Sequence, residues 1–504
     1  MQELTILELQ AKMRSGELSA QKLIEDCLER IQGIDRSGPA LNAVIELNPD
    51  ALAIAAVLDA ERAEKGARGP LHGIPVILKD NLDTADKMTT TAGSLALEGS
   101  IPVQDSTVAQ RLREAGAVLL GKANLSEWAN FRSSHSSSGW SSRGGQTLNP
   151  YVLDRNPCGS SSGSAVAVAA NLCTAAIGTE TDGSIVCPSH ANGIVGLKPT
   201  LGLVSRAGVI PIAHSQDTAG PMARCVADAA IILGALTGDD PRDAATAASQ
   251  GKAWQDYTQF LDPNGLKGAR IGVARNFFGF HPAVDAIMET CLQAMKDQGA
   301  ELIDPADIET KDKTDETEIE VLLYEFKADL NAFLASLGLQ SNVHSLEEVI
   351  KFNEANRKRV MPYFEQERMV KAQAKGPLTD EAYFKALETN HRLSREEGID
   401  ATLQKHNLQV IVAPTGGPAW LTDWVNGDHY TGGGSSSPAA VAGYPHITVP
   451  AGYVFGLPIG ISFIASAFQE PVLFRIAYAF EQATRVRKPP QYLKSIEFGH
   501  GKYG

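Results

Sequence analysis

The sequence predicts an α/β fold in which helices cover both faces of a β-sheet. Strand-like and helix-like segments alternate along the chain, and this alternation is typical of such folds. Hydrophobic residues make up 43% and charged residues 21% of the 504 residues, which excludes wholesale disorder. We find no repeat with a period of roughly 20–50 residues. We also find no long linker, so we expect one large unit rather than the roughly three domains that length alone suggests.

The first part of the chain, residues 1–65, is expected to be helical. Thr5 and Glu8 fit a capping box, and Gly16 can end the first short helix. Apolar residues then recur at helical spacing from Leu23 to Ile31 and again around residues 52–60. These patterns predict three helices before the first strand.

Short apolar runs and helical patterns alternate after residue 70. Each run is short enough for a buried strand and is followed by a polar or glycine-containing turn. We expect strands at 73–79, 117–120, 174–177, 410–413 and 446–449, and helices at 106–115 and 164–171.

The segment 301–400 differs from the rest of the chain because 35 of its 100 residues are charged. Residues 322–334 and 346–353 have the pattern of amphipathic helices. We expect a solvated helical excursion packed on the sheet, and this interpretation is compatible with a wall or lid for a substrate cleft.

Charge and hydropathy exclude several classes of partner. The net charge is −14 and there is no lysine- or arginine-rich run, so we expect no nucleic-acid and no membrane partner. No apolar run approaches the ~20 residues of a spanning helix. The N-terminus lacks a secretory leader, so we expect a cytoplasmic protein, or a periplasmic or secreted one if a leader has been removed.

The cysteines and histidines show no metal-binding pattern. The six cysteines form no CxxC pair and are irregularly spaced, and the eleven histidines include no HExxH motif. We therefore expect no metal, no cofactor and no disulfide framework.

Two familiar motifs are nearly matched. Gly116 to Lys122 fits the GxxxxGK of a phosphate loop, but Ala123 replaces the hydroxyl residue that binds Mg²⁺. Residues 159–163 fit the GxSxG elbow, with Ser161 as nucleophile and four downstream histidines as possible bases. The elbow should follow a hydrophobic strand, and residues 154–158 are not one.

Two glycine and serine clusters, at Ser160 and Ser184, are separated by a small-residue helix and a short strand. This arrangement can bring two turns together at one edge of a sheet. The run Thr181-Asp182-Gly183-Ser184 can point consecutive backbone N–H groups at one oxyanion. From spacing alone, a pair of turns without chemistry remains an open alternative.

A serine nucleophile needs a base, and no histidine stands out near either cluster. Lys79 ends an apolar run, which is where α/β sheets place reacting groups. It can act as a base if burial lowers its pKa from about 10.4 to about 7–8. An ordinary exposed lysine at the end of a strand is the alternative.

Several motifs in order resemble the amidase signature family. The match is dense over residues 65–230 and resumes at 412–415 and 439–450. The motifs are Gly73-Ile-Pro75 with Lys79-Asp80, Gly121-Lys122-Ala123-Asn124-Leu125, Gly159-Ser160-Ser161-Ser162-Gly163, Thr181-Asp182-Gly183-Ser184-Ile185, Gly196-Leu-Lys-Pro199 and Asp217-Thr-Ala-Gly-Pro221. The resemblance implies one amidase signature domain over residues 1–504, with a single large mixed sheet, catalytic core motifs at 65–230 and the helical excursion at 301–400.

The resemblance also implies a Ser–Ser–Lys triad. Ser184 would be the acyl-enzyme nucleophile and Lys79 would be the base. Ser160, held by a non-proline cis peptide bond, would bridge the two. The backbone N–H groups of Thr181, Asp182, Gly183 and Ser184 would form the oxyanion hole. No cofactor or metal is implied.

Among the subfamilies the chain is most similar to peptide amidases. The matching runs include 124–131, 138–140, 143–147, 323–328 and 440–445. This similarity implies a small-molecule or peptide amide substrate, with hydrolysis of a C-terminal carboxamide to the free acid and ammonia. The alternatives are small, aryl or fatty amides, or a glutamine-hydrolysing subunit of a transamidating complex. We expect a monomer, with a homodimer as the alternative.

Three positions depart from the family pattern. Cys158 and Ser162 stand where many members have glycine, and Val186 replaces a frequent arginine. These departures concern the shape and charge of the substrate pocket rather than the triad.

Overall fold

A computed structural model gives the structure of the chain and describes residues 3–496. Both ends of the predicted domain span 1–504 therefore lie outside the described residues. The helices are α1 (Ile6–Ser15), α2 (Ala20–Arg30), α3 (Ala51–Lys65), α4 (Thr107–Glu114), α5 (Ser162–Ala169), α6 (Val186–Ala191), α7 (Val226–Leu236), α8 (Pro282–Asp297), α9 (Asp315–Ser336), α10 (Leu346–Ala355), α11 (Arg357–Val360), α12 (Glu367–Gln373), α13 (Glu381–His391), α14 (Asp400–His406), α15 (Ser437–Ala442) and α16 (Glu470–Thr484).

The described strands form one sheet of eleven strands and a separate two-stranded ribbon. The order in the large sheet is β1-β3-β2-β6-β8-β7-β12-β13-β11-β9-β10. The strands are β1 (Val44–Leu47), β2 (Pro75–Lys79), β3 (Val118–Ala123), β4 (Trp140–Ser141), β5 (Gly145–Gln146), β6 (Ala175–Glu180), β7 (Val195–Lys198), β8 (Thr218–Ala223), β9 (Arg270–Val273), β10 (Glu301–Ile303), β11 (Val410–Pro414), β12 (His446–Val454) and β13 (Leu457–Ile464).

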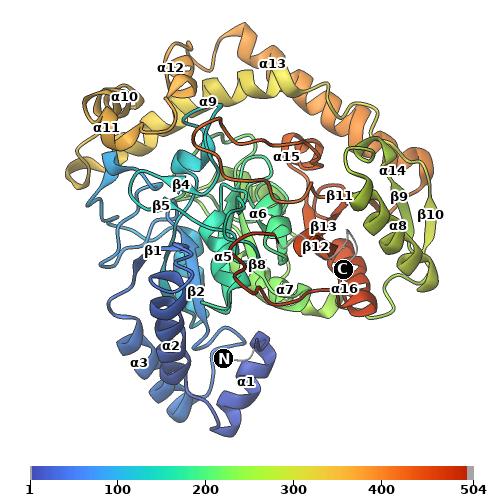
Figure 1. Cartoon of the computed structure of the whole chain (residues 1–504), viewed down its shortest axis with the longest axis horizontal. Helices are drawn as coiled ribbons and strands as arrows, with labels where there is room; N and C mark the ends of the chain where they lie inside the picture. The colour runs from blue at the N-terminus through green and yellow to red at the C-terminus, as the bar shows by residue number, and fades with distance from the viewer. Residues whose placement is uncertain (1–2, 497–504) are drawn as a thin grey trace.

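The sheet is mixed, as expected. Strands β3, β2 and β6 run parallel to one another, as do β10, β9 and β11, whereas the strands between these groups pair antiparallel. Helices α5 and α6 contact each other and the central strands, and α4, α7, α16 and α8 form a second row of mutually contacting helices on the sheet. The α/β prediction with covered faces is confirmed (Figure 1).

Most expected elements occur close to their expected positions. The capping box of Thr5 and Glu8 starts α1, and Gly16 ends that helix in a left-handed conformation. One expectation was incomplete, because residues 44–47 form edge strand β1 within the part expected to be helical. Only the first of its residues is fully buried, so the hydrophobic pattern of this strand is weak.

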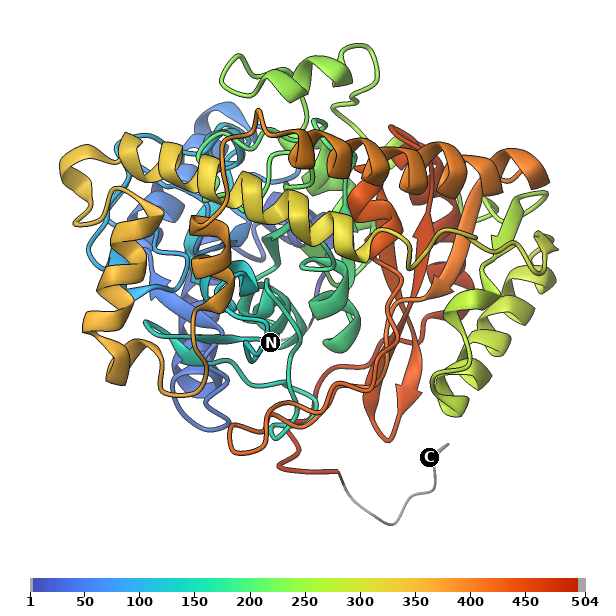
Figure 2. The same cartoon turned by 90° about the horizontal axis from the view of Figure 1, so that it is seen from above.

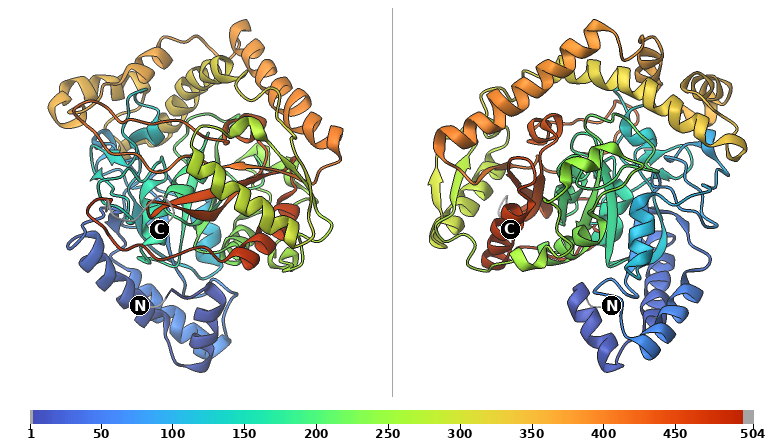
Figure 3. Two further views of the ribbon diagram at one scale, coloured as in Figure 1. Left: turned by 45° about the vertical axis from the view of Figure 1, so that its right-hand side comes forward. Right: turned by 180° about the vertical axis from the view of Figure 1, so that it is seen from behind.

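The segment 301–400 is helical after the short strand β10. Helices α9 and α13 contact each other, run together across the molecule (Figure 2) and form an arch on the side opposite the N-terminal helices (Figures 1 and 3). The buried face of α9 carries Leu322, Leu323 and Phe326, which pack on Phe131 and Ile212 of the sheet domain. The excursion is therefore anchored to the loops that follow the central strands.

No helix in the described part of the chain has the length and hydropathy needed to cross a membrane.

Candidate active site

Lys79 is the last residue of β2 and its side chain is fully buried. Its Nζ donates to Ser160 Oγ at 2.7 Å and to Thr179 Oγ1 at 2.9 Å, and it lies 3.2 Å from the carbonyl oxygen of Thr179. Burial lowers the pKa of Lys79 to about 7, although the nearby carboxylates of Asp217 and Glu180 act in the opposite direction. The lysine is therefore half neutral near pH 7, and its neutral form can accept a proton.

The two glycine and serine clusters meet at the end of this strand. The peptide bond between Gly159 and Ser160 is cis. The backbone N–H of Ser161 donates to the carbonyl oxygen of Ser184 at 3.1 Å, so the chain segments that carry Ser160 and Ser184 lie directly against each other. Ser184 is 8% exposed, and it lines a pocket of about 440 Å³. The structure thus brings Lys79, Ser160 and Ser184 into one region.

The residues before Ser184 form an open turn. Gly183 has φ 76°, a left-handed conformation that favours glycine. Within residues 3–496 the backbone N–H groups of Thr181, Asp182, Gly183 and Ser184 have no intramolecular acceptor. Four free donors in one turn beside a serine can bind an oxyanion, which agrees with the predicted nest.

Asp217 supports this turn from the start of β8. Its Oδ1 accepts a hydrogen bond of 2.6 Å from Thr181 Oγ1, and its Oδ2 accepts from the N–H groups of Ile212 and Ala213. Burial raises the pKa of Asp217 to about 6. Gln216 adds a bond from its Nε2 to the carbonyl oxygen of Thr181 at 3.2 Å.

Glu180 supports the turn from the other side. Its Oε2 accepts from the N–H groups of Ile185 and Val186, at 2.8 and 3.0 Å, so it fixes the two residues that follow Ser184. Burial raises the pKa of Glu180, and the charge of the buried Lys198 opposes this rise. Burial lowers the pKa of Lys198 to about 8. Sequence reasoning missed this electrostatic interaction because Glu180 and Lys198 lie on different strands.

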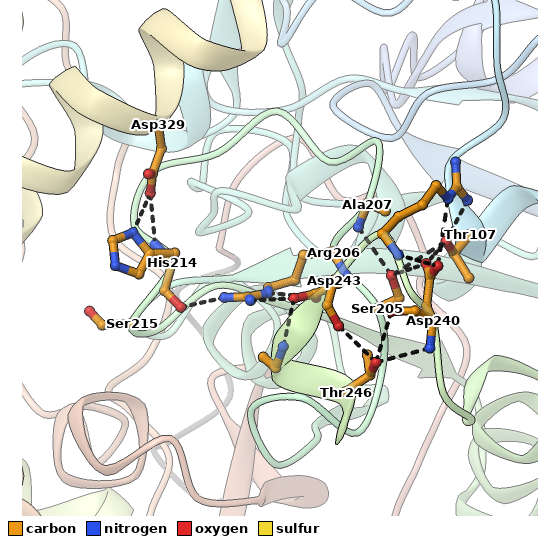
Figure 4. A network of polar contacts seen from close by, with 12 residues as sticks. Thr107, Ser205, Arg206, Ala207, His214, Ser215, Asp240, Asp243, Thr246 and Asp329 are labelled. Carbon is orange, nitrogen blue, oxygen red and sulfur yellow. Dashed lines mark hydrogen bonds and ion pairs between the residues drawn. The ribbon is translucent and has the colours of Figure 1, made fainter. Parts of the chain in front are cut away.

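A polar network holds the loop that leads to Asp217 (Figure 4). Arg206 donates three hydrogen bonds to Asp243, two from its guanidinium and one from its backbone N–H, and one to the carbonyl oxygen of His214. The Nδ1 of His214 lies 2.8 Å from Asp329 Oδ2 on α9. His214, Asp329 and Glu325 have polar atoms within 4.8 Å of one another, a spacing that a metal ion could use. Here His214 contacts both carboxylates, so these contacts tie the loop to α9.

The elbow interpretation of Ser161 does not agree with the geometry. Ser161 Oγ donates to the carbonyl oxygen of Thr179 at 3.1 Å, inside the protein. Of the four downstream histidines, His446 is buried, and its Nε2 lies 2.6 Å from Ser462 Oγ rather than beside the glycine and serine loops. Ser161 therefore acts as a structural residue at the start of α5.

The expectation of no disulfide was wrong, because Cys158 and Cys187 are bonded. The bond joins the residue before the Gly159–Ser160 peptide to α6, which follows Ser184. A signal was present in the sequence: Cys158 lies two residues before Ser160, and Cys187 lies three residues after Ser184. Irregular spacing concealed it, since pairing depends on the fold and not on local spacing.

We expect the Cys187→Ser substitution to lower the free energy of unfolding by about 3–4 kcal/mol. The bond closes a loop across a sequence separation of 29 residues, and a loop of that length stabilises by about this amount in the chain-entropy model. Urea unfolding under non-reducing conditions measures the loss, with Cys225→Ser as the control because Cys225 is a free cysteine. Equal free energies of unfolding for the two variants would contradict the prediction.

The pocket beside Ser184 is walled by the excursion. Ile319 and Leu322 of α9 and Arg368 of α12 line it together with Phe131. A second pocket of about 320 Å³ shares Asp182 and Gly159 with the first and extends to the disulfide. Ser184 thus faces a cleft large enough for a small organic substrate.

The Amidase family model matches residues 22–474 of this chain. The chain belongs to the amidase signature family. The protein is therefore an amide-hydrolysing enzyme, and the predicted family and enzyme class are confirmed.

Three relatives of this amidase cover nearly its whole length. The X-ray structure of native peptide amidase from Stenotrophomonas maltophilia superimposes with a TM-score of 0.92 at 51% identity, covering 97% of this chain and 99% of that one. A probable amidase from Arabidopsis thaliana is 44% identical over 98% of this chain and 92% of its own length. A glutamyl-tRNA(Gln) amidotransferase subunit from a Cyanothece species is 34% identical over 95% of this chain and 98% of its own.

Proposed function

We propose that this amidase hydrolyses the C-terminal carboxamide of short peptides to the free acid and ammonia. The observation that carries the mechanism is the 2.7 Å bond from Lys79 Nζ to Ser160 Oγ, made by a buried lysine whose pKa is about 7. The substrate assignment is supported by the 51% identity to a peptide amidase and by the pocket beside Ser184.

In the proposed first half-reaction, Ser184 Oγ attacks the carboxamide carbon. Its proton passes to Ser160 Oγ, and the proton of Ser160 passes to Lys79 Nζ. The oxyanion is held by the backbone N–H groups of residues 181–184. When the C–N bond breaks, the proton returns from Lys79 through Ser160 to the nitrogen, and ammonia leaves.

In the second half-reaction water attacks the acyl ester on Ser184. The same relay accepts a proton from the water, and it then returns a proton to Ser184 Oγ as the ester bond breaks. The free acid leaves and the three side chains regain their starting protonation states. Lys79 thus serves as base and then as acid, which requires a pKa near the working pH.

We expect the enzyme to release one ammonia per molecule of a C-terminally amidated dipeptide and to leave its peptide bond intact. Ammonia is measured by a coupled assay and the peptide product by mass spectrometry. Ser184→Ala should reduce the rate to background, and the exposed substitution Ser37→Ala should not change it. Release of free amino acids would contradict the proposed position of cleavage.

Glutamine is included as a second substrate because a glutamyl-tRNA(Gln) amidotransferase subunit covers almost the same length. The proposal predicts a kcat/KM for glutamine far below that for the dipeptide amide. A reversal of this order would favour the glutamine-hydrolysing alternative.

A further inference from the structure

The pocket beside Ser184 carries an excess of acidic side chains. Three carboxylates line it, those of Asp182, Asp315 and Glu318, against one guanidinium, that of Arg368. Asp182 belongs to the catalytic turn, whereas Asp315 and Glu318 lie in the first turn of α9. The formal charge of the pocket lining is therefore negative where the acyl part of a substrate would lie.

Two of these carboxylates accept hydrogen bonds only from uncharged side chains among the described residues. Glu318 is 9% exposed, and its Oε1 accepts from Gln216 Nε2 at 2.8 Å. Asp182 Oδ2 accepts from Ser437 Oγ at 2.6 Å, and its Oδ1 is buried without a hydrogen-bond partner among the described residues. Buried acidic groups are normally paired with a cation, whereas neither of these two is hydrogen-bonded to one, and Arg368 and Lys198 act on them only through their charge.

The two groups also affect each other electrostatically. Burial raises the pKa of Glu318 to about 8, and the nearby charge of Asp182 acts in the same direction. Burial likewise raises the pKa of Asp182. A cation placed between the two carboxylates would favour their ionised forms and remove this mutual destabilisation.

Neither a helix-capping role nor Arg368 accounts for the cluster. Acidic residues in a first turn favour the helix dipole, which explains the exposed Asp315 and Glu316 but not the burial of Glu318 against the pocket. The guanidinium of Arg368 lies over the ring of Phe131 at 5.5 Å. It offsets part of the charge of Glu318 and leaves the pocket acidic.

We propose that Asp182, Asp315 and Glu318 form a subsite for a cationic group of the substrate. This group is the protonated α-amino group of a short unprotected peptide amide or the side chain of a lysine or arginine residue. The proposal rests on the proposed function in one respect, namely that the acyl part of the substrate occupies this pocket.

Binding to the Ser184→Ala variant tests the subsite without any need for turnover. Isothermal calorimetry would measure Kd for alanyl-phenylalanine amide and its N-acetyl form, and for N-acetyl-lysyl-phenylalanine amide and its norleucyl counterpart. We expect at least one cationic member to bind about tenfold more tightly than its neutral counterpart, and the pair that shows the difference identifies the source of the charge. Ratios below twofold in both pairs would overturn the proposal.

Substitution of the carboxylates locates the effect. In the Ser184→Ala background, Glu318→Gln keeps an acceptor for Gln216 and should reduce the Kd ratio to below about threefold. Glu320→Gln is the matched control, because Glu320 lies on the same helix but pairs with Lys375 Nζ at 2.6 Å. The Glu320→Gln variant should keep the Kd ratio that is measured for Ser184→Ala alone.

The exposed Asp315→Asn substitution provides a second variant if Glu318→Gln disturbs folding. If neither Glu318→Gln nor Asp315→Asn lowers the ratio of the neutral to the cationic Kd, the assignment of the subsite is wrong. Because binding and ammonia release are measured separately, a wild-type enzyme that binds the cationic amide without hydrolysing it would contradict the proposed function and not the subsite.

Discussion

Replacing Lys79 by alanine should lower kcat for a dipeptide amide by about 10²–10⁴-fold, the range expected when a general base is removed. Lys79 Nζ is the basic group bonded to Ser160 Oγ, so without it the proton of Ser160 has no acceptor at neutral pH. Lys79→Arg should be equally inactive, because a guanidinium stays protonated and cannot accept a proton. Steady-state kinetics on the purified variants measures both effects.

The pH dependence follows from the same residue. Burial lowers the pKa of Lys79 to about 7, so the neutral form predominates above that pH and the charged form below it. For the wild type, kcat/KM should therefore rise about tenfold per pH unit below about 7 and level off above it. The residual rate of Lys79→Ala should lack this ascending limb.

Lys122→Met is the control for the loss of a buried lysine. Lys122 lies on the neighbouring strand β3, and its Nζ donates to the carbonyl oxygen of Leu82 and to Thr90 Oγ1 rather than to a catalytic serine. The Lys122→Met variant loses these two hydrogen bonds and some stability, but the protein that remains folded should keep most of the wild-type kcat. A Lys79→Ala enzyme with near-wild-type rates at pH 7 would show that another group is the base.

Replacing Glu180 by alanine should destabilise the protein by about 2–6 kcal/mol, because two buried backbone N–H groups lose their acceptor at a cost of about 1–3 kcal/mol each. The fully buried Lys198 also loses the electrostatic effect of Glu180, while Glu470 and Asp182 continue to act on it. The same substitution removes the acceptor that holds the N–H groups of Ile185 and Val186 after Ser184. We therefore expect kcat to fall as well, measured beside urea unfolding.

A double substitution separates the two effects. Glu180→Met with Lys198→Met replaces both charged groups by apolar side chains of similar volume, so it should recover the part of the lost stability that comes from the charge of Lys198. It should not recover kcat, because the two N–H groups still lack their acceptor. Full recovery of kcat would show that Glu180 acts only through stability and does not position the catalytic turn.

The sequence predicted the local elements well, because their signals are local. The capping box of Thr5, the apolar run before Lys79 and the amphipathic pattern of 322–334 each identify an element from a few adjacent residues. The strand order was beyond such reasoning. Strand β8 lies between β6 and β7, which precede it in the chain, and no local pattern specifies this insertion.

Parts of the candidate site were likewise predictable from local sequence, and other parts were not. The glycine and serine motifs predicted the open turn at 181–184, and the resemblance to the family assigned roles to Lys79, Ser160 and Ser184. The supporting contacts were not predicted. The bond from Cys158 to Cys187 and the electrostatic interaction of Glu180 with Lys198 depend on which segments the fold places near each other. The acidic pocket depends on an excursion that starts more than a hundred residues after Ser184.

The pairing of β12 with β7 limits how early the active site can fold during synthesis. Strand β12 pairs with β7 so that His446 lies opposite Lys198. Ser437 of α15, the helix that precedes β12, binds Asp182 of the catalytic turn. At ~5–20 residues per second, the ~250 residues between β7 and β12 take roughly 12–50 s to emerge from a ribosome. During that interval the edge of β7 that later pairs with β12 has no partner. Lys79, Ser160 and Ser184 have therefore all been synthesised well before the active site can be completed.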